Sequence, residues 1–281
     1  MKKIISASRR TDLVAFFPEW LSSALKEERA RVNGPSGYCY NVELKPQNVH
    51  TLVLWSKNFS NLIHNKNNLR NLVLKYDQLY FHFTITGLGG SFIEKGVPSP
   101  SKAISQLDPL LKIAGTPARI SVRFDPIVYW KEAGKIKTNL YFLEKMAPAL
   151  NALGLKDIRF SFAQWYPKAK KRAARYSFTY VDPSLEEKKE AARYLVEIAQ
   201  RWQLNLFSCS QDFLAAIPGI KPSACIDGRL LARLHPHQEA VSFKKDKSQR
   251  PECHCTESVD IGSYTQFCPH SCLYCYANPR V

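Results

Sequence analysis

The strongest constraint on the fold is a repeat in which short apolar segments alternate with segments of helical periodicity. Six apolar, β-rich runs predict strands over residues 3–8, 50–56, 79–85, 119–124, 157–163 and 204–209. The spacing of apolar residues between them predicts helices over residues 18–31, 60–75, 101–114, 139–153 and 185–203. Strands that alternate with helices pair in parallel, so this order predicts an α/β fold with either a doubly wound sheet or a parallel (β/α) barrel, full or partial.

The chain also carries signals for the ends of helices and for its domain organisation. Ser184 and Glu187 form the capping-box pattern at the start of the last predicted helix, and Gly115 stands where another helix stops. No low-complexity segment or linker divides the 281 residues, and 45 % of them are hydrophobic, which suffices for one full core. We therefore expect a single domain over residues 1–281, on which the cysteine-rich segment 209–281 docks.

Polar side chains follow the predicted strands, at the ends where barrel proteins collect functional groups. They are Arg9, Arg10, Asp12, Lys57, Asn58, Thr84, Thr86, Arg123, Asp125, Ser161 and Gln164. Two interpretations stay open. The set forms a polar rim around an active site, or it only supplies caps in loops that are polar in any such fold.

The N-terminus and the cysteine content bear on the compartment. Arg9 and Arg10 resemble part of an export signal, but Asp12, Pro18 and Glu19 interrupt the apolar stretch of about 7–15 residues that such a signal needs. No run reaches the ~18 apolar residues of a membrane span, so we expect a cytoplasmic protein without a membrane partner. Thiols stay reduced in the cytoplasm, and the eight cysteines therefore favour metal or cluster ligation over disulfides.

Three cysteines near the end of the chain, Cys268, Cys272 and Cys275, form a C-x3-C-x2-C array. Three thiolates on one compact loop can bind three corners of a [4Fe–4S] cubane, which leaves the fourth iron without a protein ligand. Such an iron can chelate a small molecule, and the aromatic Tyr274 directly precedes the third cysteine. This spacing resembles the signature of the radical S-adenosylmethionine (SAM) superfamily, whose open iron takes the amino and carboxylate groups of the cofactor.

The alternative for these thiols is zinc, which favours paired C-x2-C ligands and a closed set of four. Cys272 and Cys275 with Cys253 and Cys255 provide such a set. His270 lies beside better thiolate ligands, and no histidine has the pattern of partners that acid–base catalysis needs.

Seven stretches spread over the whole chain carry a further resemblance, namely "IISASRRTD", "LVLWSKN", "VRFDPI", "ACIDG", "DKSQRPECHC", "SVDIGSYTQFC" and "CPHSCLYCYAN". Through them the chain resembles a bacterial family of uncharacterised proteins that is defined by a radical-SAM-like cysteine cluster at the C-terminus. The superfamily carries its cysteine loop after the first strand, whereas here the loop comes last. If residues 259–264 form a strand and the loop follows it, the fold is a circularly permuted radical SAM barrel, and this strand lies parallel beside residues 3–8.

The resemblance implies a radical SAM enzyme that abstracts hydrogen from a substrate the sequence does not identify. It implies a [4Fe–4S] cluster on Cys268, Cys272 and Cys275, S-adenosylmethionine near Tyr274, and a reductant such as ferredoxin or flavodoxin. Residues that follow the strands are then expected to be catalytic, and they are Arg9, Arg10, Asp12, Lys57, Arg123 and Asp125. Arg9 and Arg10 in particular are expected to point towards the open iron and to hold the cofactor or the substrate. The alternatives are a zinc-stabilised nucleic-acid-binding protein without catalysis and an iron–sulfur protein for electron transfer or sensing.

Four further cysteines, in three segments of the chain, predict a second metal site. Cys209, Cys225, Cys253 and Cys255 complete a tetrathiolate set that suits either a second [4Fe–4S] cluster or zinc. The alternative is that Cys209 and Cys225 are ordinary buried thiols. Cys39 stands alone and is assigned no role.

The charge of the chain points to polyanions as partners. The 40 Lys and Arg residues outnumber the 24 Asp and Glu residues, which gives a net charge of +16. One segment interleaves basic with aromatic side chains, namely Lys168, Lys171, Arg172 and Arg175 on one predicted helical face beside Trp165, Tyr166 and Tyr176. This pattern is typical of contacts with DNA or RNA, and the alternative is a solvated face. The cysteine loop is also similar to that of radical enzymes that repair DNA photoproducts, but only over the loop.

Overall fold

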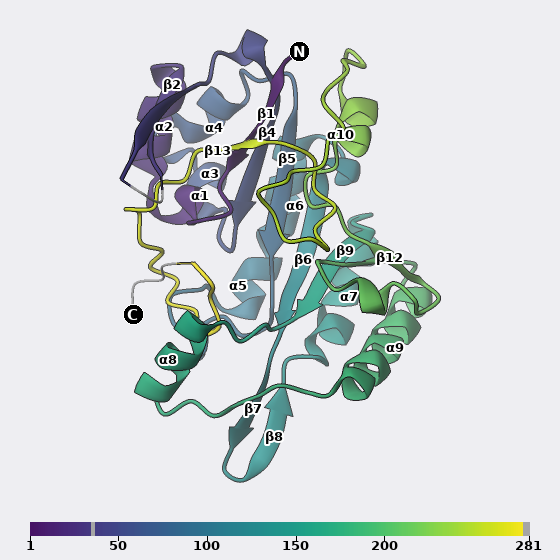
Figure 1. Cartoon of the computed structure of the whole chain (residues 1–281). Coiled ribbons are helices and arrows are strands. Elements are labelled where there is room, and N and C mark those ends of the chain that lie inside the picture. Colours follow the sequence, from purple (N-terminus) through teal and green to yellow (C-terminus); the bar gives the residue numbers. More distant parts are fainter. Residues whose placement is uncertain (35–36, 278–281) are drawn as a thin grey trace.

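The structure, a computed structural model, describes residues 1–34 and 37–277 of the chain (Figure 1). Its centre is one eight-stranded sheet in which all neighbouring strands are parallel. The strands are β1 (Lys3–Ala7), β4 (Val49–Ser56), β5 (Leu79–Thr84), β6 (Ile120–Ile127), β9 (Asp157–Phe162), β11 (Asn205–Ser208), β12 (Ile220–Pro222) and β13 (Val259–Asp260). All the predicted strands are present within a few residues of their predicted bounds. The prediction of an α/β fold with a parallel sheet is confirmed.

The strands follow one another across the sheet in the order β12-β11-β9-β6-β5-β4-β1-β13. Among the strands of this sheet, each one from β4 to β12 lies beside the strand that precedes it in the sheet along the chain, so the order runs in one direction from β1 to β12. A doubly wound sheet reverses its order at a switch point near its middle, whereas here only β13 lies on the other side of β1. Within the described residues the sheet has two ends, β12 and β13, which do not pair with each other.

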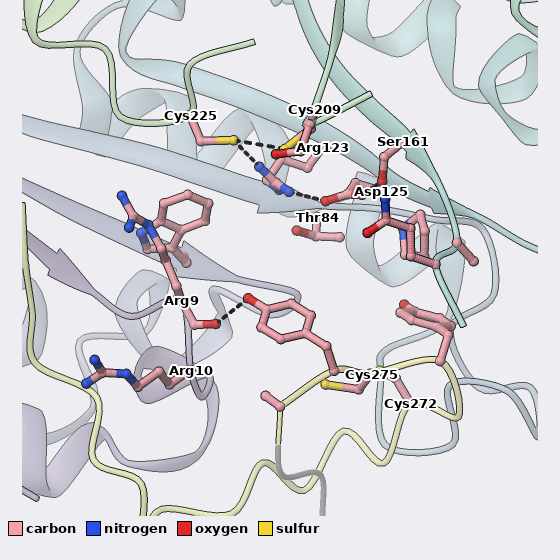
Figure 2. A pocket seen from close by; sticks show the side chains of 18 of the residues that line it. Arg9, Arg10, Thr84, Arg123, Asp125, Ser161, Cys209, Cys225, Cys272 and Cys275 are labelled. Atoms are coloured by element: carbon pink, nitrogen blue, oxygen red, sulfur yellow. Dashed lines mark hydrogen bonds and ion pairs between the residues drawn. The ribbon is translucent and has the colours of Figure 1, made fainter. Parts of the chain in front are cut away.

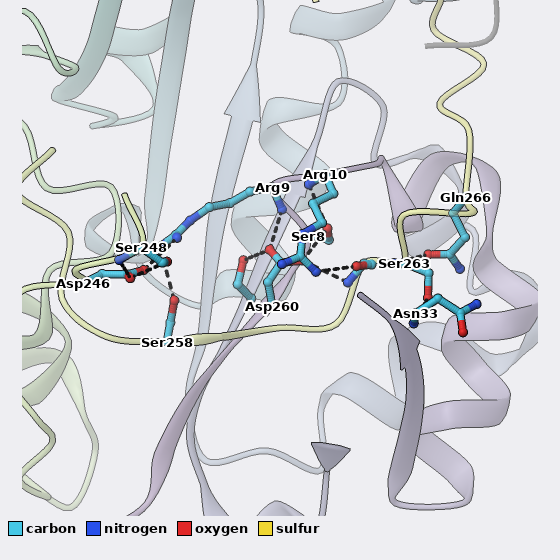
Figure 3. Close-up of polar contacts among 12 residues, drawn as sticks. Ser8, Arg9, Arg10, Asn33, Asp246, Ser248, Ser258, Asp260, Ser263 and Gln266 are labelled. Carbon is cyan, nitrogen blue, oxygen red and sulfur yellow. Dashed lines mark hydrogen bonds and ion pairs between the residues drawn. The ribbon is translucent and has the colours of Figure 1, made fainter. Parts of the chain in front are cut away.

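Segments from the two ends of the chain meet at one edge of this sheet. Strand β13 lies parallel to β1, with Val259 opposite Ile5 and Asp260 opposite Ser6. The predicted pairing of residues 259–264 with the first strand is thus confirmed, but the strand stops at Asp260. It stops because the Asp260 carboxylate turns back onto the chain, where it accepts hydrogen bonds from the side chain of Ser6 and the amide of Gly262 at 2.9 Å each (Figure 3).

Helices connect the strands. They are α1 (Leu13–Phe16), α2 (Pro18–Lys26), α3 (Ser60–Ile63), α4 (Leu69–Val73), α5 (Pro100–Ile104), α6 (Leu107–Ala114), α7 (Phe142–Ala152), α8 (Pro167–Arg175), α9 (Leu185–Arg201) and α10 (Gly228–Leu234). Helix α9 begins at the predicted capping box, in which the Ser184 side chain accepts from Glu187. The predicted helix 60–75 is instead broken in two by Asn65, Asn67 and Asn68, which all have positive φ, a conformation that asparagine tolerates better than most residues.

Short elements that the periodicity did not predict complete the fold. They are an antiparallel pair of β2 (Arg29–Asn33) and β3 (Cys39–Glu43), a small sheet of β7 (Tyr129–Glu132), β8 (Lys135–Thr138) and β10 (Tyr180–Val181), and the 3-10 turns η1 (Pro46–Asn48), η2 (Lys66–Asn68), η3 (Pro117–Arg119) and η4 (Asp212–Leu214). No helix in the described part of the chain combines the length and the apolar character needed to cross a membrane.

The two faces of the large sheet are covered differently. One face packs against the helices and forms the main core, to which Leu54, Phe83 and Phe124 contribute from the strands. The opposite face carries Ile4, Val53 and Tyr80, and these pack against residues between 225 and 255 instead. The late segment of the chain (residues 236–262) therefore packs, together with α10, on the sheet face opposite the other helices, here called the open face (Figure 1).

Candidate functional site

A cavity of about 280 Å³ opens where the strands of the large sheet end (Figure 2). Most of the polar residues expected at the strand ends line it, namely Arg9, Arg10, Asp12, Lys57, Thr84, Arg123, Asp125, Ser161 and Gln164. Every cysteine except Cys39 lines it as well. Asn58 and Thr86 are not part of the lining. Because carboxyl ends of parallel strands share one edge, loops from distant parts of the chain converge on this space.

The loop that carries Cys268, Cys272 and Cys275 forms one wall of the cavity. Cys272 is 5 % exposed. Burial raises the pKa of Cys268 to about 12 and raises the pKa of Cys272 well above its ordinary value. Without a metal these thiols are therefore protonated, and a metal that binds them must displace the protons.

The loop after β5 holds this cysteine loop in place. The amide of Gly96 donates to the carbonyl of His270 at 3.1 Å, and the amide of Leu273 donates to the carbonyl of Ile93 at 3.0 Å. A β-carbon at Gly96 would lie 2.3 Å from the carbonyl oxygen of Pro269, so only glycine allows this approach.

Arg172 on α8 fixes the other side of the cysteine loop. Its Nε donates to the carbonyl of Leu273 at 3.1 Å, and its Nη2 donates to the carbonyl of Cys275. Arg172 is 9 % exposed and faces inward with its helix neighbours Ala169 and Ala173. The prediction that Arg172 shares an outer basic face is therefore wrong, because the small alanines bring this face of the helix against the loop.

Asp12 connects three separate parts of the site through its carboxylate. It accepts from the amide of Ala15 at 2.9 Å, from the hydroxyl of Ser56 at 2.9 Å and from the amide of Lys57 at 2.8 Å. Nε2 of His270 lies 2.7 Å from the same carboxylate. The chain's own donors thus occupy the carboxylate, and Asp12 positions loops. No sequence pattern had paired His270 with it.

Lys57 faces the buried carboxylate of Glu94. Its ammonium donates to Oε1 of Glu94 at 2.9 Å, and the hydroxyls of Thr86 and Tyr274 donate to the same oxygen. Burial has the largest single effect and lowers the pKa of Lys57, but the charge and hydrogen bond of Glu94, together with other negative groups nearby, outweigh it, so the net shift is upward. Glu94 is fully buried, and its Oε2 has no hydrogen-bond partner among the described residues. Sequence patterns had not singled out Glu94.

The side chains of Arg9 and Arg10 do not point towards Cys272 and Cys275. Figure 3 shows the Arg9 side chain reaching towards Asp246 and Ser258, and the guanidinium of Arg10 lying near Ser263 instead. That of Arg9 forms an ion pair with Asp246 at 3.2 Å, whereas that of Arg10 donates to the carbonyl of Gly262 at 2.8 Å. Nearer acceptors on the late segment of the chain thus hold both side chains.

Figure 2 shows Cys209 and Cys225 on a different wall of the cavity from Cys272 and Cys275. The sulfur atoms of Cys209 and Cys225 are 3.6 Å apart, and Cys253 and Cys255 pack in the same buried cluster. The neighbouring Cys255 lowers the pKa of Cys253 to about 6. These contacts place Cys253 and Cys255 with Cys225, and so speak against a zinc site shared with Cys272 and Cys275.

Arg123 joins this second group of cysteines to the polar strand ends. Its Nη1 donates to the sulfur of Cys225 at 2.6 Å, and its Nη2 forms an ion pair with Asp125. The hydroxyl of Ser161 donates to the same Asp125. Two of the expected catalytic residues, the buried Arg123 and the half-buried Asp125, thus form a pair between the cavity and the cysteines.

The fold and the site together define a class of α/β protein. Its sheet is parallel and wound in one direction, and its strand-end cavity is lined by two groups of cysteines. Residues 4–277 match the family described as "Domain of unknown function (DUF1848)", and the chain therefore belongs to that family. No curated protein matches the sequence. The expected membership of an uncharacterised family is confirmed.

Proposed function

We propose that this protein is a radical SAM enzyme whose [4Fe–4S] cluster is held by Cys268, Cys272 and Cys275. The observation that carries the proposal is the place of these thiols. They share one loop in the wall of a cavity at the carboxyl ends of a parallel sheet, where such enzymes of the α/β type work. A donor set of three thiols, apart from the other cysteines, fits a cluster with one open iron.

The strand order supports a circularly permuted barrel, full or partial, as the framework. Read from β13 across the sheet, the order continues through β1, β4 and onwards to β12 in the order of the chain. Strand β13 therefore takes the place of a first strand, and the cysteine loop that follows it takes the place that the superfamily gives it. In this proposal the circular permutation changes only the position of the chain termini, and the strands keep their places in the sheet.

The residues around the loop fit a group that carries charge. Lys57 and Arg172 bring cationic groups to the buried thiols, and the charge of Lys57 by itself lowers the pKa of Cys272. Thiolates are soft ligands, and they bind iron–sulfur clusters in preference to hard cations. A buried anionic cluster needs such cations nearby, because an isolated buried charge is costly.

When bound, the cluster and S-adenosylmethionine supply a 5′-deoxyadenosyl radical that abstracts hydrogen from a substrate, after one electron from a reductant such as ferredoxin or flavodoxin. The chain itself holds and shields the reactants. Gly96, His270 and Arg172 fix the loop, and Lys57 with Glu94 keeps a paired charge beside it. Arg250, which also lines the cavity, donates to Gln164 at 2.6 Å.

The proposal is tested by anaerobic purification followed by measurement of iron and of reductive SAM cleavage to 5′-deoxyadenosine. We expect cleavage by the wild-type protein and by Cys39→Ser, a control at an exposed cysteine outside the cavity. Cys268→Ser, Cys272→Ser and Cys275→Ser should each lose about four iron atoms per chain and all cleavage activity, because three thiolates are the minimum for this cluster. Full iron content and activity in any of the three would refute the assignment.

The same measurements discriminate the competing functions. A colourless protein that holds only zinc and produces no 5′-deoxyadenosine would support a zinc-stabilised binding protein. A brown protein that holds iron but does not cleave SAM would support an iron–sulfur protein for electron transfer or sensing.

A further inference from the structure

Four thiols on the cavity wall opposite the cysteine loop come from three parts of the chain. Cys209 follows β11, Cys225 precedes α10, and Cys253 and Cys255 belong to the late segment that lies on the open face of the sheet. All four are free thiols. The backbone amide of Ile226 donates to the sulfur of Cys255 at 3.3 Å. Amide-to-sulfur hydrogen bonds of this kind are typical of metal-bound thiolates.

The spacing of the first pair fits two ligands of one metal. Metal–sulfur bonds of about 2.3 Å at tetrahedral angles place two sulfurs about 3.8 Å apart, and the sulfurs of Cys209 and Cys225 are 3.6 Å apart. The four sulfur atoms as a set are spread more widely than this pair. Among the described residues, the group whose metal-ligand atoms all lie within 4.8 Å of one another is a different one, Asp77, His235 and Glu239. A metal would therefore draw Cys253 and Cys255 inward.

The acidic group is not the stronger candidate, because a cation of the chain already occupies it. The ammonium of Lys2 lies 2.8 Å from Glu239 and 3.4 Å from Asp77. This ion pair satisfies the carboxylates without a metal.

Charge gives an independent argument for thiolates at the cysteines. Arg159 is 3 % exposed, and it donates to the hydroxyl of Ser121 and to the carbonyl of Ala224, next to Cys225. No ion pair within 4.0 Å involves it in the described part of the chain, and the carboxylate of Asp157 acts on it only from a longer distance. A buried guanidinium without a counter-ion costs several kcal/mol, at roughly the scale of a broken buried ion pair. Four thiolates on a divalent ion, or on a [4Fe–4S] cluster, provide the missing negative charge.

We infer that Cys209, Cys225, Cys253 and Cys255 bind a second, tetrathiolate metal centre that fastens the late segment of the chain onto the open face of the sheet. Cys225, Cys253 and Cys255 belong to the apolar cluster that joins this segment to the strand residues Ile4, Val53 and Tyr80. A metal here would cross-link segments that packing, hydrogen bonds and ion pairs already hold together, so metal binding contributes to folding stability. This inference does not depend on the proposed radical chemistry.

The test starts from a variant in which Cys268, Cys272 and Cys275 are all serine, so that metal at the other group is measured alone. We expect this variant to retain metal, and adding Cys225→Ser or Cys253→Ser should remove it, whereas adding Cys39→Ser should not. About one zinc per chain in a colourless protein identifies zinc. Iron with sulfide in a brown protein identifies a cluster. No metal in the triple variant above the level of the quintuple variant that also lacks Cys225 and Cys253 overturns the inference.

A measurement on the native protein covers the case in which these variants do not fold. Iodoacetamide is added before and after a chelator, and the alkylated cysteines are identified by mass spectrometry. We expect alkylation of Cys209, Cys225, Cys253 and Cys255 only after chelation, together with easier proteolysis of residues 244–258. Cys39, which is exposed, should react in both conditions. Equal reactivity of the four thiols before and after chelation contradicts a metal centre.

Discussion

Two buried histidines at the edge of the molecule away from the cavity illustrate how single residues respond to burial. The rings of His50 and His235 are 4.5 Å apart, and neither side chain is accessible to solvent to any notable extent. Burial lowers the pKa of both, although the nearby charge of Glu239 acts in the opposite direction. Both histidines are therefore neutral in the folded protein at neutral pH.

We expect acid to destabilise the protein through these histidines. Their folded pKa is below the unfolded value of about 6.5, so the unfolded chain binds more protons in the window below pH 6.5 and the free energy of unfolding falls as the pH falls there. Urea unfolding at pH 7 and pH 5 measures the difference. The difference in the free energy of unfolding between the two pH values should be smaller in His50→Gln than in the wild type. It should be unchanged in His64→Gln, where the side chain is exposed. An equal loss of stability in all three proteins would rule out this source.

At the scale of elements, the loop after β5 and helix α8 act as the two supports of the cysteine loop. The contact at Gly96 has no room for a side chain. By contrast, a β-carbon at Gly90, in the same loop, would meet nothing within 4 Å, although its φ is +79°. The two glycines therefore separate the effect of loop displacement from the effect of backbone strain.

Gly96→Ala should displace the cysteine loop. We expect faster alkylation of Cys272 in the metal-free protein, and loss of the iron that the loop is proposed to hold, because the new methyl group would overlap the carbonyl of Pro269. Gly90→Ala should lower the free energy of unfolding by about 1–2 kcal/mol through its left-handed backbone but leave the alkylation rate unchanged. If both variants expose Cys272 equally, the contact at Gly96 does not position the loop.

For the whole molecule, the net charge of +16 predicts attraction to nucleic acids and other polyanions. Helix α8 offers a matched pair of substitutions, because Lys171 is exposed whereas Arg172 supports the cysteine loop. Replacing either residue by alanine removes one positive charge.

We expect binding to a single-stranded oligonucleotide, measured by fluorescence anisotropy, to weaken steeply as salt increases. Lys171→Ala should reduce the slope of log K against log salt by roughly one unit, whereas Arg172→Ala should leave the slope unchanged and raise the alkylation rate of Cys275 instead. Binding that is absent or insensitive to salt would show that the basic face of α8 is only solvated.

Local patterns determined much of this protein. Apolar runs specify the strands, because a strand that is buried on both faces of a sheet needs apolar residues at several consecutive positions. The capping box at Ser184 marked the start of α9, and the C-x3-C-x2-C spacing placed three thiols on one loop. Only the periodicity of neighbouring residues is needed for such predictions.

Tertiary structure alone decided which way the charged side chains point and how the cysteines divide. Arg9 turns to Asp246, and Asp12 meets His270, through contacts that span more than two hundred residues of sequence. Arg172 turns inward because α8 packs through its alanines. An ion pair or a hydrogen bond depends on distances of a few ångströms, and the winding of the sheet, not the spacing of residues along the chain, sets those distances.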